Sequence, residues 1–312
     1  MGAMPVHADV RVGLLAYGAI GYEHNLAVQN TDGLRLAAVC DSKPERIAAA
    51  RELATDFTGF ADATEMLDSG LLELVVISTP PNSHYRWAKE SLLRGIHVVL
   101  EKPMALTTAE CDELMALARD KNLLLVVYQN RRFDPDFVTL RSAVASGAIG
   151  DVYQFDTFVG GYSRPCDYWH SDAAVSGGAI FDWGSHFIDQ ILNVITDDVA
   201  HVSGQNHKRV WTHATNADHA QVTITFATGK QATFIHSDLA AAASPSSTCS
   251  ARRGRSWAIG IRWPSRRWPT FRQSSRCIGR TRRRNESSSS PSPNTSSTGR
   301  SLRALRPVRR WR

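Results

Sequence analysis

The fold is decided by residues 14–24, which read LLAYGAIGYEH and overlap a short run of apolar and β-branched residues, VRVGLLA at 10–16. Such a run predicts a buried strand, and the glycine-rich turn after it predicts the start of a helix. Ala16, Gly18 and Gly21 stand at the three positions of the G-x-G-x-x-G pattern that binds dinucleotides. In that pattern the second glycine lets the backbone approach a pyrophosphate, and the third lets the helix pack on the strand.

Alanine at the first of these positions departs from the pattern. We expect Ala16 to narrow the turn without abolishing binding, provided that its φ angle stays negative. A glycine pattern alone is weak evidence, because many such turns are only structural. The predicted cofactor-binding residues of this turn are Ala16, Gly18, Ala19, Ile20 and Gly21.

An acid follows the second predicted strand, LRLAAVC at 34–40. Asp41 lies twenty residues beyond Gly21, where a carboxylate accepts hydrogen bonds from the adenosine ribose hydroxyls and repels a 2′-phosphate. The cofactor is therefore predicted to be NAD or NADP, with NAD preferred. Ser42 is a further predicted cofactor contact, and Lys43 and Arg46 nearby leave NADP open.

Three more apolar runs continue the same alternation, at 72–79, 95–101 and 122–128. Buried strands that alternate with amphipathic helices predict a doubly wound parallel sheet, an α/β Rossmann domain that we place at residues 1–128. Thr107 with Glu110 predicts a capping box at the start of one of the helices.

Polar residues follow two of these strands, at the edge of an open α/β sheet where ligands bind. The alternatives are a helix-capping role for Asn82 or Ser83 and a surface ion pair for Lys102. The predicted cofactor contacts here are Ser78, Thr79, Pro80, Asn82 and His84 after one strand, and Glu101 and Lys102 after the next.

The pattern changes from about residue 129. A helix at 134–147 is followed by strands with period-two alternation at 220–228 and 230–237. We predict a second, α+β domain at residues 129–240 with an open, mostly antiparallel sheet. Between these elements, GGAIFDWGSH at 177–186 places Asp182 and His186 four residues apart, close enough on a helix to share a proton. The alternative is a buried structural pair at a helix start.

Residues 241–312 have a different composition, with eighteen arginines, no lysine and a single acid, Glu286. The segment carries a formal charge of +17, which leaves −11 on the first 240 residues of a chain whose net charge is +6. We interpret it as out of the native reading frame, or else as a disordered basic tail, so that the sheet of the second domain is incomplete.

Composition also excludes several classes of protein. The acidic first 240 residues predict no nucleic-acid partner, and no apolar run is long enough for a membrane span, so a cytoplasmic location is the default. The five scattered cysteines form no C-x-x-C pair. We therefore expect reduced thiols and no metal site.

The motifs AYGAIG, STPPNSH, EKP and GGAIFDWGSH together resemble the glucose-fructose oxidoreductase and inositol dehydrogenase family, Gfo/Idh/MocA. VVYQNRRFDPDF, at 126–137, looks like the branch of scyllo-inositol dehydrogenase-type enzymes. The resemblance covers residues 10–240, and the C-terminal segment does not match.

The resemblance implies that Lys102, Asp182 and His186 are catalytic and that they also contact the substrate. Oxidation of a secondary alcohol requires a base for the hydroxyl proton as hydride leaves carbon for the nicotinamide. We assign that role to His186, with Asp182 orienting its ring, while Lys102 stabilises the developing alkoxide. Gly184 is expected to keep the helix face open to the substrate.

Other candidates are weaker, since packing explains them nearly as well. Asn130 and Arg132 are placed near the nicotinamide or the substrate, with surface salt bridges as the alternative for the arginine. His201, His207, His213, His219 and His236 show no metal-ligand spacing and receive no role. An aromatic loop, with Tyr168, is predicted to line a polyol pocket through Tyr162, Trp169 and His170.

The sequence thus predicts an NAD(P)-dependent oxidoreductase that acts on a secondary hydroxyl of a sugar, inositol or related polyol. A homo-oligomer, dimer or tetramer, is implied by the resemblance if the second domain is intact. The alternatives are a non-catalytic relative that senses NAD(P) or a sugar, a nucleic-acid binder acting through the arginine-rich segment, and a truncated, inactive enzyme.

Overall fold

A computed structural model of the 312-residue chain describes residues 9–241, 244–251 and 256–259. The interpretation of 241–312 as out of frame or disordered falls largely outside these residues, as does Cys277. Of the cysteines that are described, Cys40, Cys111, Cys166 and Cys249 are free thiols.

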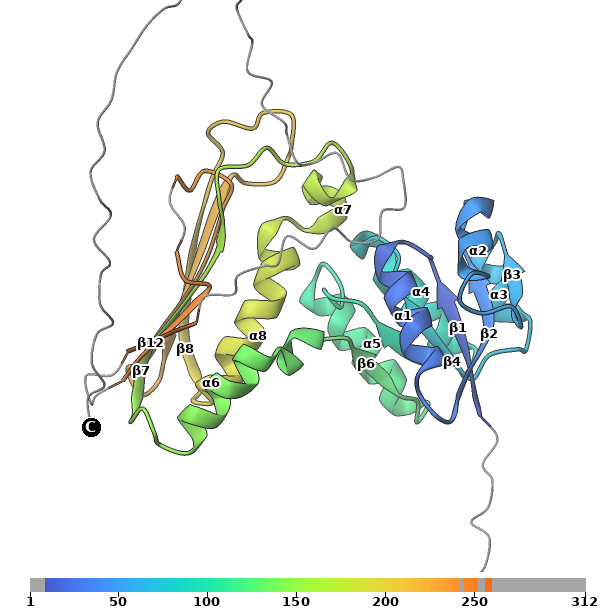
Figure 1. Ribbon diagram of the computed structural model, residues 1–312, viewed down its shortest axis with the longest axis horizontal. Helices are drawn as coiled ribbons and strands as arrows, with labels where there is room; N and C mark the ends of the chain where they lie inside the picture. The colour runs from blue at the N-terminus through green and yellow to red at the C-terminus, as the bar shows by residue number, and fades with distance from the viewer. Residues whose placement is uncertain (1–8, 242–243, 252–255, 260–312) are drawn as a thin grey trace, which may run out of the picture. The chain divides into compact units, whose positions relative to one another are not determined.

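The first sheet has six parallel strands in the order β3-β2-β1-β4-β5-β6, coloured blue to green in Figure 1. The five apolar runs of the sequence form strands as predicted, and β3 is an additional short strand at one edge. The strands are β1 (Val10–Leu15), β2 (Leu34–Cys40), β3 (Thr58–Phe60), β4 (Leu74–Ile77), β5 (His97–Leu100) and β6 (Leu125–Val127).

Helices cover both faces of this sheet, so alternate residues of a strand are buried in two different apolar clusters. Val12 and Leu14 of β1 belong to one apolar cluster, and Leu15 belongs to the other. The helices are α1 (Ala19–Gln29), α2 (Pro44–Ala50), α3 (Ala63–Asp68), α4 (His84–Leu93), preceded by the short turn η1 (Pro81–Ser83), and α5 (Thr108–Asp120). The predicted capping box of Thr107 and Glu110 at the start of α5 is confirmed.

The second sheet has the order β12-β11-β7-β10-β9-β8. It is mixed, since β10 runs parallel to β7 and the other neighbouring pairs are antiparallel. The prediction of an α+β domain with a mostly antiparallel sheet is therefore confirmed. The strands are β7 (Val152–Gly160), β8 (Val199–His207), β9 (His219–Phe226), β10 (Gln231–Ser237), β11 (Ser247–Ala251) and β12 (Ser256–Ile259).

Two helices, α6 (Pro135–Ala145) and α8 (Ser185–Val194), lie on one face of this sheet (Figure 1). Helix α8 buries Phe187 and Ile191, four residues apart, and Phe187 stacks on Phe234 of β10 with 6.0 Å between ring centroids. The remaining short turns are η2 (Asn130–Phe133), η3 (Trp169–Ser171), α7 (Ala173–Ser176) and η4 (Ile180–Gly184).

The second sheet extends past residue 240, where the regular pattern of the sequence ends. Strand β11 pairs with β7 and buries Cys249 and Ala251 in the same core as Phe187. Small residues at alternate positions carry little hydrophobic signal, so this strand is not evident from composition.

Among the described residues, no helix combines the length and apolar character needed to cross a membrane.

Candidate active site

The turn between β1 and α1 has the features of a dinucleotide-binding loop. Gly18 precedes α1 without a capping side chain, and a Cβ atom built on it would meet nothing within 4 Å. A Cβ atom on Gly21 would lie 2.8 Å from the carbonyl oxygen of Ala16, so the third glycine of the pattern is needed for close packing. The open backbone at Gly18 and the uncapped N-terminus of α1 fit a pyrophosphate.

Ala16 corrects one expectation. Its φ angle is +72°, in the left-handed region, whereas the sequence analysis relied on a negative φ. The tight turn requires the conformation that glycine normally supplies, and the Cβ atom of alanine makes this conformation unfavourable. Ser78, after β4, supports the turn by donating its hydroxyl hydrogen bond to the carbonyl oxygen of Ala16 at 2.9 Å.

Asp41 lies at the end of β2 and is buried. Its Oδ2 atom accepts hydrogen bonds from the amide of Tyr17 at 2.8 Å and from Arg46 at 3.1 Å, while Oδ1 accepts from the amide of Lys43 at 2.9 Å. A carboxylate has about four lone-pair positions, so one remains for a ribose hydroxyl. Arg46 places a cation beside this acid, and Ser42 is exposed next to it.

The loops after β4 and β5 are joined through His84, whose Nδ1 atom makes a buried contact with the carbonyl oxygen of Pro103. Thr79 accepts from the hydroxyl of Ser83 at 2.7 Å, and both ring nitrogens of His84 face backbone carbonyl oxygens. Asn82 is exposed and Pro80 is partly buried. No side-chain cap from Ser83 is formed at the start of α4.

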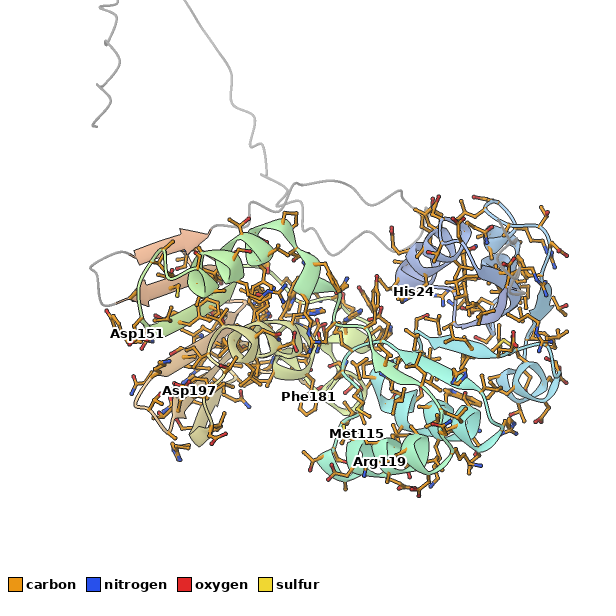
Figure 2. The ribbon with its side chains drawn as sticks, turned by 90° about the horizontal axis from the view of Figure 1, so that it is seen from below. His24, Met115, Arg119, Asp151, Phe181 and Asp197 are labelled. Atoms are coloured by element: carbon orange, nitrogen blue, oxygen red, sulfur yellow. The ribbon has the colours of Figure 1, made fainter. Side chains whose placement is uncertain are left out.

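Glu101 is buried at the end of β5 and pairs with a histidine that the sequence analysis missed. The Nε2 atom of His24 lies 2.9 Å from Oε1 of Glu101, and the amide of Lys102 donates to Oε2 at 3.2 Å. Figure 2 labels His24, which lies on α1 and contacts the ring of Tyr128 edge-on. His24 follows Gly21 by three residues, about one helical turn, so both lie on the buried face of α1. This spacing was the available signal that His24 faces the site.

Lys102 and Asp182 are brought together from distant parts of the chain. The Nζ atom of Lys102 lies 2.5 Å from Oδ1 of Asp182 and 3.3 Å from its carbonyl oxygen. Burial raises the pKa of Asp182, but the charge and hydrogen bond of Lys102 outweigh it and hold this pKa below its ordinary value. The carboxylate is therefore ionised across the physiological range.

His186 is placed differently from the prediction. Among the described residues, Asp182 bonds to Lys102, and no hydrogen bond joins it to His186, whose Nδ1 atom is buried without a partner. The preceding turn η4 is π-helical, and the lysine ammonium is a stronger partner for the carboxylate than a neutral ring. Burial, followed by the charges of Lys102 and Arg131, lowers the pKa of His186 to about 3.

Glycines shape the segment that carries Asp182. Gly177 and Gly178 both adopt positive φ angles, and a Cβ atom on Gly177 would lie 2.6 Å from the ring of Phe181. A Cβ atom on Gly184 would approach Phe234 to 3.1 Å. Gly184 therefore allows η4 to pack on β10, whereas the sequence analysis expected it to keep the helix face open to substrate.

Two further histidines lie in the electrostatic environment of Asp182. The Nδ1 atom of His170 is 3.9 Å from Oδ2 of Asp182, and its ring stacks on Trp169 with centroids 3.7 Å apart. His236 of β10 is buried, and its Nδ1 atom has no partner. Burial lowers the pKa of His236, while the carboxylates of Asp238 and Asp182 act in the opposite direction. The sequence analysis gave His236 no role, although it lies two residues after the buried Phe234 and therefore on the same face of the strand.

The other predicted contacts are more peripheral. Tyr162 is 65% exposed, and its ring lies against Trp211. Arg132 forms an ion pair with Asp189 of α8 at 2.5 Å, the alternative that the sequence analysis left open. Asn130 is partly buried in η2. Tyr168 is half exposed and contacts the rings of Trp169 and His170.

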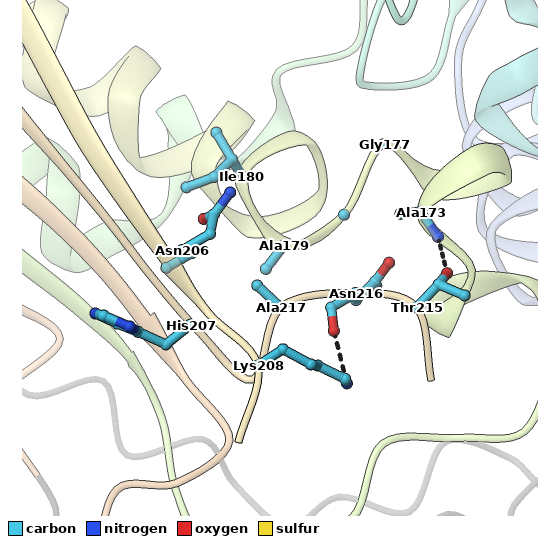
Figure 3. Close-up of a pocket in the computed structure, with 12 residues that line it drawn as sticks. Ala173, Gly177, Ala179, Ile180, Asn206, His207, Lys208, Thr215, Asn216 and Ala217 are labelled. Carbon is cyan, nitrogen blue, oxygen red and sulfur yellow. Dashed lines mark hydrogen bonds between the residues drawn. The ribbon is translucent and has the colours of Figure 1, made fainter. Parts of the chain in front are cut away.

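A cavity of about 310 Å³ opens beside residues 177–180, the segment that leads to Asp182. Figure 3 shows its polar side chains, among which Lys208 donates to the carbonyl oxygen of Asn216 at 2.8 Å. Lys102, Asp182 and His186 do not line it. The three residues therefore form a separate cluster, which we treat as the candidate active site because it contains the ion pair and the unpartnered ring nitrogen.

Comparison with known protein families matches two stretches of the chain. Residues 10–129 match the model of the Gfo/Idh/MocA oxidoreductase family with its NAD-binding Rossmann fold, and residues 137–255 match that family's C-terminal domain. The chain belongs to the Gfo/Idh/MocA family. The second match also corrects the predicted limit of the resemblance, since it continues fifteen residues past 240 and includes β11.

Individual members of the family are similar over part of their length. The chain is 42% identical over 131 residues to an uncharacterized oxidoreductase of Schizosaccharomyces pombe, covering 42% of this chain and 36% of that protein. It is 30% identical to the NADP⁺-dependent scyllo-inositol 2-dehydrogenase IolW of Bacillus subtilis, covering 59% of this chain and 51% of the enzyme. The chain thus spans about half the length of such curated relatives or less.

Solved structures of other proteins share the fold. An NAD-binding protein from Listeria innocua superposes with a TM-score of 0.72 at 27% identity, covering 79% of this chain and 70% of that one.

Proposed function

We propose that this Gfo/Idh/MocA protein is an NAD(P)-dependent oxidoreductase that interconverts a secondary hydroxyl of a sugar, inositol or related polyol and the corresponding ketone. The observation that carries the proposal is the 2.5 Å contact between Lys102 and Asp182, because it joins the end of the dinucleotide-binding sheet to the segment that contains His186. The inositol dehydrogenases among its relatives support the substrate class.

The turn at Gly18 and the N-terminus of α1 would hold the pyrophosphate. The carboxylate of Asp41 would accept a hydrogen bond from a ribose hydroxyl. We propose NAD as the preferred cofactor, with NADP open because Arg46 lies 3.1 Å from the acid. When bound, the nicotinamide supplies the hydride acceptor.

The protein's own residues would handle the proton and the developing charge. Two N–H groups of Lys102 face the Oδ1 atom and the carbonyl oxygen of Asp182, and the third would stabilise the alkoxide oxygen. His186 is neutral near pH 7, since its pKa is about 3, so its ring has a free lone pair; so low a pKa makes it a weak base, and the proposed proton transfer depends on Lys102 and Asp182 as well. Asp182 would then stabilise the imidazolium through its negative charge. His236, with its unpartnered Nδ1 atom, would contact a neighbouring hydroxyl.

The full chain tests this proposal directly. NAD and NADP binding would be measured by calorimetry, and nicotinamide reduction would be followed with a panel of inositols and aldoses. Turnover of at least one polyol that Lys102→Ala abolishes is the expected result. Saturable dinucleotide binding without turnover of any polyol would favour the non-catalytic sensor, and a folded chain that binds neither dinucleotide would refute the proposal.

We also propose a homo-oligomer. Described helices α6 and α8 cover one face of the second sheet, and all residues of β8 except the last are exposed, Val199 and Val202 among them. An exposed edge strand with apolar side chains is suited to pairing. Light scattering should give a dimer or tetramer, and a monomer at micromolar concentration would count against it.

A further inference from the structure

His84, the first residue of α4, lies between the two loops that carry the predicted cofactor contacts of the strand ends. Its ring is 1% exposed. The Nδ1 atom lies 2.7 Å from the carbonyl oxygen of Pro103, the residue after Lys102, and Nε2 lies 2.8 Å from the carbonyl oxygen of Thr79. One side chain thus bridges the loop after β4 and the loop after β5. Because both nitrogens are occupied inside the protein, the ring is not oriented for direct contact with a cofactor.

The two partners of His84 have the same hydrogen-bonding character. Both are backbone carbonyl oxygens, which only accept, whereas a neutral imidazole has a single N–H group. A neutral ring can therefore donate to one loop only, and its other nitrogen directs a lone pair at a carbonyl oxygen. The doubly protonated ring donates to both. The contacts of His84 are complete in only one of its two charge states.

The charges around the ring act in both directions. Burial is the largest effect and lowers the pKa of His84 below its ordinary value, while the two carbonyls and Glu101 raise it and Lys102 lowers it. Glu101 is itself paired with His24, and Lys102 with Asp182. Helix α7, which packs on η1, contains no titratable side chain and begins after Asp172. Because the net shift is downward, the ring gains its second proton only below the ordinary pKa of histidine.

We propose that His84 is a positioning residue that fastens the loop of Thr79 to the loop of Lys102, and that it holds both only in its doubly protonated form. The consequence for function rests on the dinucleotide binding proposed above. With a neutral ring, one of the two loops loses its hydrogen bond and is held less firmly. Dinucleotide affinity then increases as the pH falls through the titration of this one ring.

The charge state of the ring can be tested without any ligand. Nitrogen-15 spectra of the full-length, histidine-labelled protein, recorded from about pH 8 to the lowest pH at which the protein stays folded, distinguish the two neutral tautomers from the charged ring. We expect both His84 nitrogens to carry slowly exchanging protons at the acidic end and only one at the alkaline end. A single neutral tautomer across the whole range would overturn the proposal, whether or not the chain binds NAD.

The consequence for binding is tested with NAD as the probe. Calorimetry on the wild type should give a dissociation constant about three- to tenfold lower at a pH where the spectra show the doubly protonated ring than near pH 8, the effect of one charge-assisted hydrogen bond. His84→Gln, whose amide donates to one carbonyl at every pH, should lose this dependence. His201→Gln, exposed on β8, is the matched control and should keep it. An unchanged pH dependence in His84→Gln would refute the role, whereas absence of NAD binding in the folded wild type would refute the proposed function instead.

Discussion

The ammonium group of Lys102 lies 2.5 Å from the carboxylate of Asp182, although eighty residues separate them in the chain. The lysine follows β5 of the parallel sheet, and the aspartate lies in the π-helical turn before α8. This one ion pair links the predicted cofactor site to the predicted base, so its removal should affect turnover more than binding.

Asp182→Asn removes the charge with almost no change in shape. We expect kcat with the best polyol substrate to fall about a hundredfold, since Lys102 loses its partner and the imidazolium loses a stabilising charge. The dissociation constant of NAD should change by less than about threefold, because the substitution leaves the turn at Gly18 intact. Asp189→Asn, which breaks the equally short pair with Arg132, is the control. Equal losses in both variants would contradict a specific role for Asp182.

His186 predicts how stability depends on pH. Its pKa is about 3 in the folded protein and about 6.5 when unperturbed, so between these values the unfolded chain binds a proton that the folded chain does not. Stability therefore increases with pH across this window, by about 1.4 kcal/mol per pH unit for a single ring. Urea unfolding of the wild type at several pH values should show this loss on acidification.

His186→Gln should reduce that slope without abolishing it, because burial also lowers the pKa of His84. The exposed His201→Gln should leave the slope unchanged. A His186→Gln variant as acid-sensitive as the wild type would show that the ring is not buried as described.

Ala16→Gly should stabilise the first domain. The φ angle of +72° costs alanine about 1–2 kcal/mol, which glycine avoids, while the added flexibility of the unfolded chain returns part of this gain. We expect a net increase of about 0.5–1 kcal/mol in the free energy of unfolding. Ala27→Gly, on the exposed face of α1, should instead lose about 1 kcal/mol. Destabilisation by both changes would mean that Ala16 has an ordinary backbone conformation.

Arg46→Ala tests the choice of cofactor. The guanidinium lies 3.1 Å from Asp41 and is the cation placed to offset that acid. Without it, the dissociation constant of NADP should rise about tenfold while that of NAD changes little, because only NADP adds a phosphate at this position. Arg119→Ala, on α5 (Figure 2), provides the control. A parallel loss of both dinucleotides would contradict the assignment.

Much of the fold is predictable because its strands are short runs of apolar and β-branched residues. The length and composition of the runs in β1, β2, β4 and β5 favour buried strands over helix segments. Strand β3 consists of Thr58, Gly59 and Phe60 and is too short to give a signal. Strand β11 alternates serine and threonine with Cys249 and Ala251, so its burial depends on the partner strand β7.

The candidate site was predictable in its residues but not in its pairing. Lys102, Asp182 and His186 were identified from motifs, yet helical spacing suggested that the aspartate would bond to the histidine. A spacing rule describes neighbours on one helix, whereas Lys102, the residue that pairs with Asp182, belongs to the other domain. The same limit applies to His24, whose partner Glu101 lies 77 residues away.

The position of β7 in the second sheet constrains the order in which this domain can assemble. Both of its neighbours, β10 and β11, come later in the chain, the second of them ending at Ala251. During synthesis, β7 therefore leaves the ribosome before β10 and β11 have been made. About ninety further residues, added at about 5–20 residues per second, must follow β7 before both of its edges can form hydrogen bonds. A strand in the interior of the sheet is thus among the last to complete its pairing, so the second sheet can be completed only late in synthesis.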